Sequence, residues 1–382
     1  MESQRMSFCD SKTVLSYMEP NFRFNLALKI PFIRKAEKAA PLHINRLELE
    51  DDCVVVNETE YSMRVYRQCQ AKTKSFGGNG EVQTKNKSLG AGREVIGLSR
   101  GEVNYDFDEY GFKISPEESI QPGDIKLNES ARAFQRRGCK LDELEYECPE
   151  KSSLPCNHFI RLYVSGCKYQ FSYTNMKMYF LMKRLLTIFF GNRNGEWTVK
   201  NMNIGNSVLL RWPVNGWKPI VQNFNIGEYS QIKLNGVESI IGANVSLPTL
   251  KTSFPFFGFS ISDHTVLRNA EHLIFSGFAQ DTHLPTLFSI RTHKVSLTFP
   301  TQGFFVEALI DMWMEKTRPI GVRYLILADS KANLARISRP EVLQRSSACI
   351  KLKMGDEAIV VVRYTEADSK TWLTIETVPK KK

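Results

Sequence analysis

The chain has 382 residues and a formal net charge of +10, with 42% hydrophobic and 11% aromatic residues. This is enough apolar side chain to build packed cores, so the composition excludes a wholly disordered protein. The basic balance favours acidic partners. The one dense basic run is Lys380–Lys382. No nucleic-acid-binding motif accompanies the charge, so the sequence argues against nucleic acid as the partner.

Residues 1–40 are predicted to form short helices. Helices are expected over Ser11–Met18, over Phe22–Lys29 and, for a turn or two, over Phe32–Ala39. Asp10 or Ser11 can cap the first helix, because a short side-chain oxygen accepts from the free amides of the first turn. Pro20 and Asn21 are expected to break the chain between the first two helices, and Pro31 to end the second.

A β section is expected over residues 41–69. The β-branched and aromatic residues there predict strands at Leu42–Leu49, Cys53–Val56 and Tyr61–Tyr66, the last two joined by a hairpin turn at Asn57-Glu58. Residues 70–101 are rich in Gly, Lys and Asn and poor in large apolar groups, which predicts a flexible loop. Residues 102–160 are expected to be a mixed connecting region that includes a short charged helix over Arg132–Glu150.

Residues 161–345 carry the strongest internal signal, a repeat. Val199–Gly205 (VKNMNIG) recurs as Val221–Gly227 (VQNFNIG), with five of seven residues identical at a spacing of 22. A helix is predicted over Asn175–Phe190 and another over Gly303–Thr317. Further strands are predicted at Val199–Ile204, Val245–Leu250, His272–Phe275, Lys294–Thr298 and Val322–Leu327.

The intervals between these strands are roughly 22 to 29 residues, which is typical of strand–helix units in a leucine-rich-repeat-like solenoid. The leucine and asparagine consensus is absent, so we expect degenerate repeats. Residues 346–382 predict an antiparallel β cap with a basic tail, built from strands at Cys349–Lys353, Glu357–Tyr364 and Thr371–Val378. The predicted fold is therefore a mixture of α+β and α/β: short helices and a β hairpin, then repeats and a cap.

Motifs for chemistry are missing from the sequence. There is no P-loop, HExxH pair, nucleophile elbow or paired CxxC, so we predict no catalytic residue, cofactor or metal site and no enzymatic activity. Thiol and imidazole groups recur at Cys139, Cys148, Cys156, His158 and Cys167. They can be read as a zinc site, but their spacing favours unrelated buried thiols.

The histidines of the second half favour ordinary polar or half-buried roles, because no nucleophile stands at a recognisable spacing. These are His264, His272, His283 and His293, with Asp263 and Asp281 nearby. Two tryptophans, Trp212 and Trp217, are expected in a turn between repeat strands. They have two interpretations that the sequence leaves open: anchors for a protein target, or side chains that fill space beneath a loop.

The apolar segments of the sequence predict the cellular compartment. The first thirty residues contain no signal-peptide core, and the most apolar stretch, Met176–Phe190, is interrupted by Lys183 and Arg184. A membrane-spanning helix needs about 20 apolar residues. We therefore expect an intracellular protein of the cytoplasm or nucleus, with no membrane association and with reduced cysteines.

The N-terminal segment resembles the first helix of an F-box. Thr13–Pro20 reads TVLSYMEP, which is similar to the Ile/Leu-Leu-x-Tyr-Leu-Asp-Pro run that packs on a Skp1-type adaptor. The longer pattern resembles an uncharacterised, lineage-expanded nematode family with an F-box-like N-terminus. The matching segments are Val14–Met18, Asn21–Arg23, Lys29–Pro31, Pro41–Ile44, Asn57–Tyr61, Leu309–Trp313 and Ile320-Gly321.

The resemblance implies a recognition protein that recruits a target to a Skp1-cullin ubiquitin ligase. It implies that an adaptor binds the residues at Val14, Leu15, Tyr17, Met18, Pro20 and Phe22. The repeat region would then hold an unknown protein target. In the alternative interpretation, the same residues form a local helical core, and the chain is a self-contained binding module for a protein or, less readily, for nucleic acid.

Overall fold

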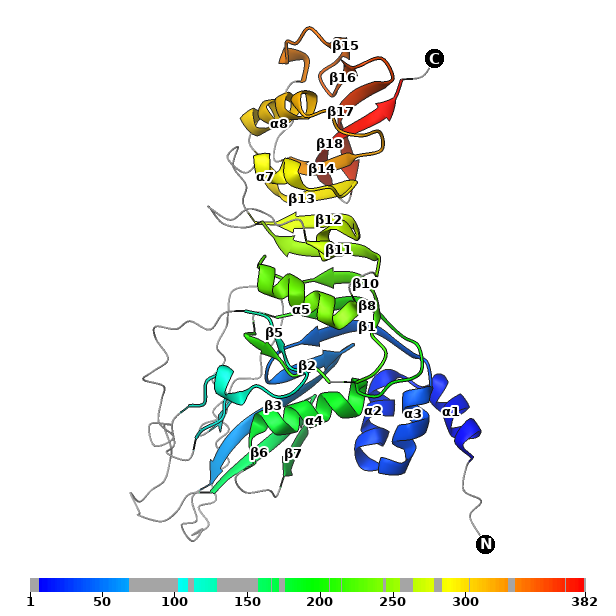
Figure 1. The fold of residues 1–382 in the computed structure, drawn as a ribbon, viewed down its shortest axis with the longest axis vertical. Coiled ribbons are helices and arrows are strands. Elements are labelled where there is room, and N and C mark those ends of the chain that lie inside the picture. The colour runs from blue at the N-terminus through cyan, green and yellow to red at the C-terminus, as the bar shows by residue number, and fades with distance from the viewer. Residues whose placement is uncertain are drawn as a thin grey trace. The chain divides into compact units, whose positions relative to one another are not determined.

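A computed structural model describes most of the chain. The described residues are 7–68, 102–108, 113–128, 157–165, 167–171, 176–205, 207–213, 215–242, 245–254, 264–277, 284–301, 303–328, 334–367 and 369–380. The expected flexible loop at 70–101 and the expected charged helix at Arg132–Glu150 lie outside these ranges. The fold is a mixture of helices and strands, and it divides into two compact units (Figure 1).

Unit 1 contains Met1–Trp197 and Ser207–Trp217, and unit 2 contains Thr198–Asn206 and Lys218–Lys382. This division differs from the expected one. The predicted repeat region begins at residue 161, whereas β6 (Asn157–Val164), β7 (Cys167–Phe171) and the helix α4 (Met178–Phe190) all belong to unit 1. The periodicity of α4 predicts the helix itself, but it carries no information about which strands that helix covers.

Unit 1 begins with short helices. They are α1 (Phe8–Ser16), α2 (Pro20–Lys29), the 3-10 turn η1 (Pro31–Ile33) and α3 (Arg34–Ala39). Two details correct the prediction. The cap of α1 is Ser7, whose side chain accepts from the Asp10 amide, and not Asp10 or Ser11. Pro20 starts α2 rather than only breaking the chain, because its missing N–H costs nothing at the first helical position.

An antiparallel sheet follows these helices in unit 1. Its strands run in the order β1 (Leu42–Leu49), β2 (Cys53–Val56), β3 (Thr59–Gln68), β6 (Asn157–Val164) and β7 (Cys167–Phe171), and β4 (Glu102–Val103) also pairs with β3. The hairpin at Asn57-Glu58 is confirmed, with Asn57 at a φ of 54° and Val56 paired to Thr59. A 3-10 turn, η2 (Glu117–Ser119), and a small two-stranded sheet of β5 (Ile125–Lys126) and β9 (Leu209–Leu210) complete the unit.

Unit 2 is built on parallel strands that lie side by side in chain order. They are β8 (Trp197–Ile204), β10 (Ile220–Asn225), β11 (Leu247–Ser253), β12 (Ala270–Ser276), β13 (Lys294–Thr301) and β14 (Arg323–Ala328). Helices stand between most of them: α5 (Gln231–Ile241), α6 (Thr265–Arg268), α7 (Leu284–Ser289) and α8 (Gly303–Glu315). Figure 1 shows α5, α7 and α8 on one side of these strands.

The core of unit 2 is a row of apolar residues that crosses the strands. Direct neighbours in the row are Met202, Phe224, Leu250, Leu273, Val295 and Tyr324, and each is buried. Trp313 of α8 packs edge-on against Tyr324 and donates its indole N–H to Thr377 Oγ1 at 3.0 Å. One strand–helix unit cannot bury its apolar face alone, so neighbouring units share one core.

The predicted antiparallel cap is present. β15 (Val342–Arg345), β16 (Cys349–Met354), β17 (Ala358–Ala367) and β18 (Lys370–Pro379) pair in antiparallel order after the short turn η6 (Leu334–Arg336). Gly355, at a φ of 68°, makes the turn between β16 and β17. Sequence reasoning missed that β18 also pairs antiparallel with β14, which joins the cap to the parallel strands in one sheet.

Candidate functional site

The N-terminal helices of unit 1 carry a concentration of exposed apolar side chains. The exposed fractions are 46% for Phe8, 41% for Val14, 90% for Tyr17, 57% for Phe22 and 85% for Phe32. Large apolar residues that stay in water lose the stabilisation that burial would give. An accumulation of them within 25 residues of chain is the pattern expected of a partner-binding surface. We call these five residues the N-terminal apolar set.

The six residues expected to bind an adaptor are divided by the structure. Val14, Tyr17 and Phe22 are exposed. Leu15 and Pro20 are buried, and Met18 is half-buried. Leu15 packs with Ala36 and Ala40 in a small core against which Met18, Leu26 and Ile33 also pack. The helical segment therefore has its own apolar interior and an apolar exterior, on different residues of the same helices.

Local signals explain how α2 is placed. The carboxylate of Glu19 accepts from the amides of Asn21 and Phe22 and so caps the first turn of the helix. Asn21 is tied to the sheet, because its side-chain amide donates to the Val56 carbonyl at 3.0 Å and its oxygen accepts from Tyr61 Oη at 3.1 Å. These bonds set the rotation of α2 and leave Phe22 directed to solvent.

The buried side of α2 packs on α4. Phe24 stacks on Phe189 with ring centroids 4.3 Å apart and meets Phe190 edge-on at 5.7 Å. Aromatic pairs in such geometries add about 0.5–1.5 kcal/mol to the burial of their area. The N-terminal helices are therefore an integral part of unit 1, and only their outer side is available to a partner.

A buried ion cluster fastens the same helices. Glu37 of α3 accepts from Arg23 of α2 at 3.1 Å and from Arg193, which follows α4, at 3.1 Å through one of its nitrogens. All three side chains are almost completely buried. Burial lowers the pKa of Arg193 to about 10 and also lowers the pKa of Arg23, while Glu37 opposes both shifts. One carboxylate thus balances two buried guanidinium groups.

Lys38 adds a third cation beside this cluster. Its ammonium donates to the carbonyls of Thr187, at 3.3 Å, and of Ile188 near the C-terminal end of α4, where the helix dipole favours positive charge. Burial, reinforced by Arg193, lowers the pKa of Lys38 to about 7. Gly195 lies so close to α3 that an added Cβ would stand 2.7 Å from the Ala39 carbonyl oxygen. The chain after α4 is therefore fitted against α3.

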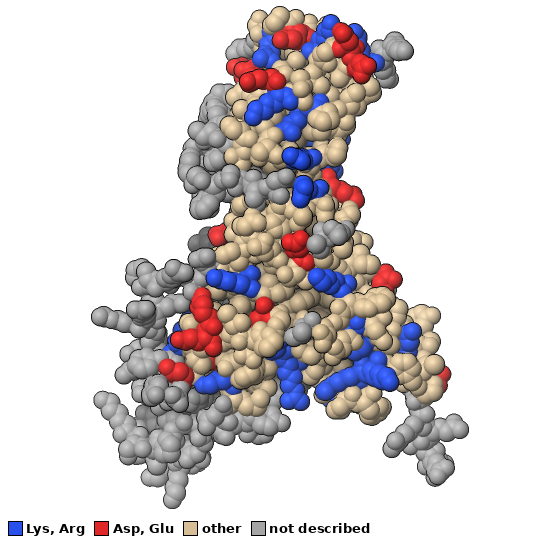
Figure 2. Space-filling model, viewed as in Figure 1, with Lys and Arg blue, Asp and Glu red and all other residues tan. Residues whose placement is uncertain are grey.

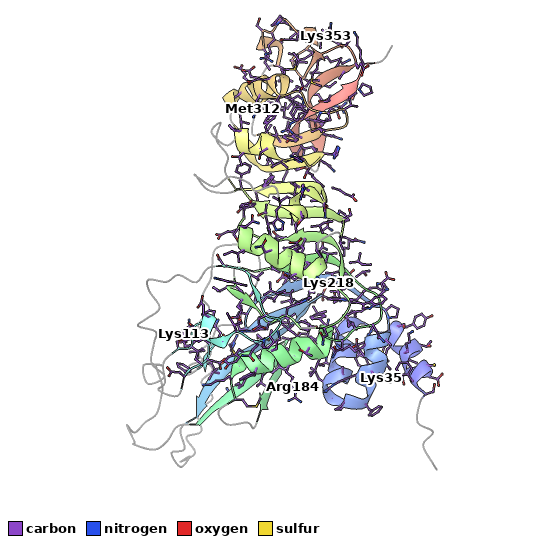
Figure 3. All side chains as sticks on the ribbon, in the orientation of Figure 1. Lys35, Lys113, Arg184, Lys218, Met312 and Lys353 are labelled. Carbon is purple, nitrogen blue, oxygen red and sulfur yellow. The ribbon has the colours of Figure 1, made fainter. Side chains whose placement is uncertain are left out.

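The surroundings of the N-terminal apolar set are basic. Lys29 and Lys35 are exposed, and Figure 2 shows Lys and Arg side chains gathered over α2 and α3. Lys35 is labelled on this part of the ribbon in Figure 3. Apolar side chains with a charged rim are the usual anatomy of a protein–protein interface. A partner for this surface would carry an apolar groove and acidic side chains at its edge.

The two tryptophans have different environments. Trp212 is 8% exposed and stacks with Phe190 and Trp197 in the interior of unit 1. Trp217 is 62% exposed, although its backbone amide donates to Arg193 and its carbonyl accepts from the Trp197 indole at 2.7 Å. Trp212 is therefore core, and Trp217 remains available as a surface residue. Both belong to unit 1 and not to unit 2.

The residues considered for metal or catalytic chemistry lie only partly within the described ranges. No three of the His, Cys, Asp and Glu side chains in these ranges are grouped so as to hold a metal ion. Cys139, Cys148 and Cys156 of the candidate zinc cluster lie outside those ranges. His264 caps α6 and contacts Asn235 at 3.0 Å, and His272 contacts Ser296 at 2.7 Å. Both histidines form hydrogen bonds within unit 2, with His264 buried and His272 half-buried.

Sequence reasoning missed Phe8 and Phe32 as surface candidates. Phe8 precedes the predicted first helix. Phe32 was expected in the third helical segment but lies in η1.

Among the described helices, none is long and apolar enough to cross a membrane.

Comparison with protein families places one part of the chain. Residues 177–327 match a protein family that is described as a domain of unknown function (DUF3557). The matched range contains α4 and strands β8 to β13 and ends within β14. Comparison with curated proteins finds no match, and comparison with solved structures finds none either. The match is consistent with an uncharacterised family.

Proposed function

We propose that this chain is a non-enzymatic recognition protein with two binding regions. The N-terminal helices bind a Skp1-type adaptor of a cullin ubiquitin ligase in the manner of an F-box. The strand–helix units of unit 2, interpreted as degenerate leucine-rich-repeat-like repeats, hold a protein target for ubiquitin transfer. The proposal includes membership in the uncharacterised nematode family with an F-box-like N-terminus, and an intracellular location.

The observation that carries the proposal is the N-terminal apolar set. Its five members lie on α1, on α2 and on η1, with Tyr17 just after the end of α1, and three of them are residues that the F-box resemblance assigns to the adaptor. Side chains as large as Tyr17 and Phe32 give an anchor when they enter a partner pocket. The interior of the segment is filled by other residues, so binding needs no unfolding of the helices.

Residues within this segment have separate roles in the proposal. Val14, Tyr17 and Phe22 contact the adaptor directly, together with Phe8 and Phe32. Leu15, Met18 and Pro20 act by holding the helices in place, because their side chains face the interior. A substitution at Leu15 would therefore remove binding through loss of folding and would not test the contact itself.

The test is a pulldown of the purified full chain with a Skp1-type adaptor. The wild-type chain is expected to bind, and the double variant Tyr17→Asp/Phe22→Asp is expected to lose binding while its unfolding curve is unchanged. Leu343→Asp is the matched control, because Leu343 is 56% exposed in β15 of unit 2. Failure of the wild-type chain to bind any such adaptor would sink the ligase part of the proposal.

A self-contained binding module is the second candidate. It is favoured by the buried contacts of the N-terminal helices, the Arg23–Glu37 ion pair and the stacking of Phe24 on Phe189, because these contacts hold the helices in unit 1 without an adaptor. In this case the N-terminal apolar set binds a different protein or a second copy of the chain. The pulldown distinguishes the two candidates, because only the first predicts an adaptor that is lost with Tyr17 and Phe22.

A further inference from the structure

The side of the parallel strands that faces away from the buried apolar row of unit 2 is polar. Two rows of side chains cross the strands on this side, and we call them together the open face. The first row is Asn201, Asn223, Thr249, His272, Lys294 and Arg323. The second row is Asn203, Asn225, Lys251, Ile274, Ser296 and Leu325.

The two similar seven-residue segments, Val199–Gly205 and Val221–Gly227, form one end of the open face. Because the two copies lie on paired strands, Asn201 is opposite Asn223, and Asn203 is opposite Asn225. The Asn223 amide donates to Asn201 Oδ1 at 3.1 Å and to the Lys200 carbonyl at 3.2 Å. The result is a two-by-two array of carboxamides, in which the Asn225 oxygen also accepts from the Gly227 amide at 3.1 Å. Carboxamides are groups that can both donate to and accept from a peptide backbone.

The charge of the open face is positive. The two rows contain Lys251, Lys294 and Arg323 and no carboxylate. Lys200, next to Asn201, is exposed, as are Lys251 and Lys294. None of these three lysines forms an ion pair with a carboxylate of the described residues, whereas Arg323 has Glu376 at 3.9 Å. Glu271 stands beside the first row and accepts from Ser246 Oγ at 2.9 Å.

We propose that the open face binds an extended acidic segment of a protein target. The inference rests on the proposed function, in which unit 2 holds the target, and it specifies the chemistry of that target. Lysines without an internal counter-ion complement carboxylates, and the asparagine array hydrogen-bonds the backbone of an extended chain. Six strands spaced about 4.8 Å apart extend over about 24 Å, the length of about seven extended residues.

Nucleic acid fits the same surface less well. Binding of single strands uses aromatic side chains on which bases stack, and the two rows contain no Phe, Tyr or Trp. The cations are separated by Thr249, Ile274 and Ser296 rather than forming a continuous track. An acidic peptide requires only the separated charges and the hydrogen-bonding groups that the open face supplies.

The experiment measures fluorescence anisotropy with the full chain. The probe is a labelled decapeptide of alternating glutamate and serine, compared with its glutamine counterpart and with a ten-nucleotide oligouridylate. The wild-type chain is expected to bind the glutamate peptide at least tenfold more tightly than the glutamine peptide, with an affinity that falls as salt rises. Equal binding of the two peptides would overturn the inference.

Variants distinguish binding at the open face from nonspecific attraction of the peptide to the positively charged chain. Lys251→Glu/Lys294→Glu is expected to weaken glutamate-peptide binding at least tenfold, and Lys251→Gln/Lys294→Gln to weaken it by a smaller factor. The charge-matched control Lys316→Glu/Lys370→Glu, at exposed positions outside the rows, is expected to change it less than twofold. Equal losses in the variant and its control contradict the inference. Tighter binding of the oligouridylate, lost in the same variant, would assign the surface to nucleic acid and overturn it.

The outcome is independent of the adaptor test. A chain that binds the glutamate peptide but no Skp1-type adaptor keeps the open face as a peptide site and overturns only the ligase role. If the chain binds the adaptor but binds the glutamate and glutamine peptides equally, the ligase role stands and only the inference about target chemistry is overturned.

Discussion

The two units of the molecule are held together in different ways. In unit 1, three carboxylates are completely buried in ion pairs: Glu37 with two arginines, Glu102 with Arg64 and Arg161, and Asp124 with Lys183 and Arg211. Two further pairs of unit 1, Arg46 with Glu48 and Arg211 with Asp51, are partly exposed. In unit 2, at least one partner of each described ion pair is substantially exposed. Its strands share a continuous apolar row instead. Unit 1 therefore depends on a few specific contacts, and unit 2 on many similar ones.

The difference matters for how each unit tolerates change. A buried ion pair that loses one partner leaves an uncompensated charge, which is costly. An apolar row that loses one side chain loses the packing of that side chain and keeps the rest. The first three predictions below test this contrast by perturbing one unit while the other serves as an internal reference.

The largest effect is expected from Glu37→Gln. The substitution leaves Arg23 and Arg193 buried without their shared counter-charge, so the free energy of unfolding of unit 1 should fall by about 3–5 kcal/mol. Urea unfolding followed by hydrogen exchange of unit 1 and unit 2 peptides measures the two units separately. Unit 2 should be unchanged. Asp356→Asn is the control, since Asp356 is 96% exposed in its pair with Lys353, and it should alter stability by less than about 0.5 kcal/mol. Similar losses from both variants would contradict the account of unit 1.

The next effect is expected from Leu273→Ala in the apolar row of unit 2. Leu273 is fully buried between Leu250 and Val295, so truncation should cost about 2–5 kcal/mol of unit 2 stability. Its neighbour in β12, Ile274, is half-buried on the open face, and Ile274→Ala should cost clearly less. Equal costs at the two positions would show that the apolar row is not the main core. The measurement is the same urea experiment, read from unit 2 peptides.

A smaller effect is expected from pH at Lys38. Its pKa is about 7 in the folded chain, against an ordinary value of 10.5, so between these values the unfolded chain holds a proton that the folded chain releases. The stability that Lys38 contributes should therefore increase as pH rises from about 7 to about 10.5. Comparison of wild type with Lys38→Met at pH 6.5 and pH 9 by urea unfolding isolates this contribution. The free energy of unfolding of the wild type minus that of the variant should be more positive at pH 9 than at pH 6.5. The same value of this difference at both pH values would contradict the shift in the pKa of Lys38.

The same contrast explains what the sequence could predict. Helix α8, the parallel strands and the cap strands β16 to β18 were predicted within a few residues, because their signals are local: one apolar face at helical spacing, or alternation along a strand. Strand β15 was not predicted. The order of the parallel strands β8 to β14 follows the chain, so a local pattern also indicates their neighbours, whereas the pairing of β18 with β14 departs from chain order. In the two similar seven-residue segments that begin at Val199 and Val221, four equivalent positions pair in register across β8 and β10.

Unit 1 was less predictable because its contacts are distant in sequence. Glu37 meets Arg193 across 156 residues, and no local pattern connects them. The apolar residues of α1 indicate a helix, but Leu15 is buried and its neighbour Val14 is exposed, an assignment that depends on how α3 packs. Trp212 is buried by Phe190 and Trp197, partners that the turn-like sequence around it does not indicate. The separation of the N-terminal segment into interior and exterior residues thus required the tertiary structure.

The most direct test of the central claim is hydrogen exchange of the full chain with and without a Skp1-type adaptor. The account predicts slower exchange in peptides that cover Phe8–Ile33, which carry the N-terminal apolar set, and unchanged exchange in peptides that cover β11 to β13. Unchanged exchange over Phe8–Ile33 at adaptor concentrations that saturate a known F-box protein would contradict the claim that these helices are the adaptor-binding surface.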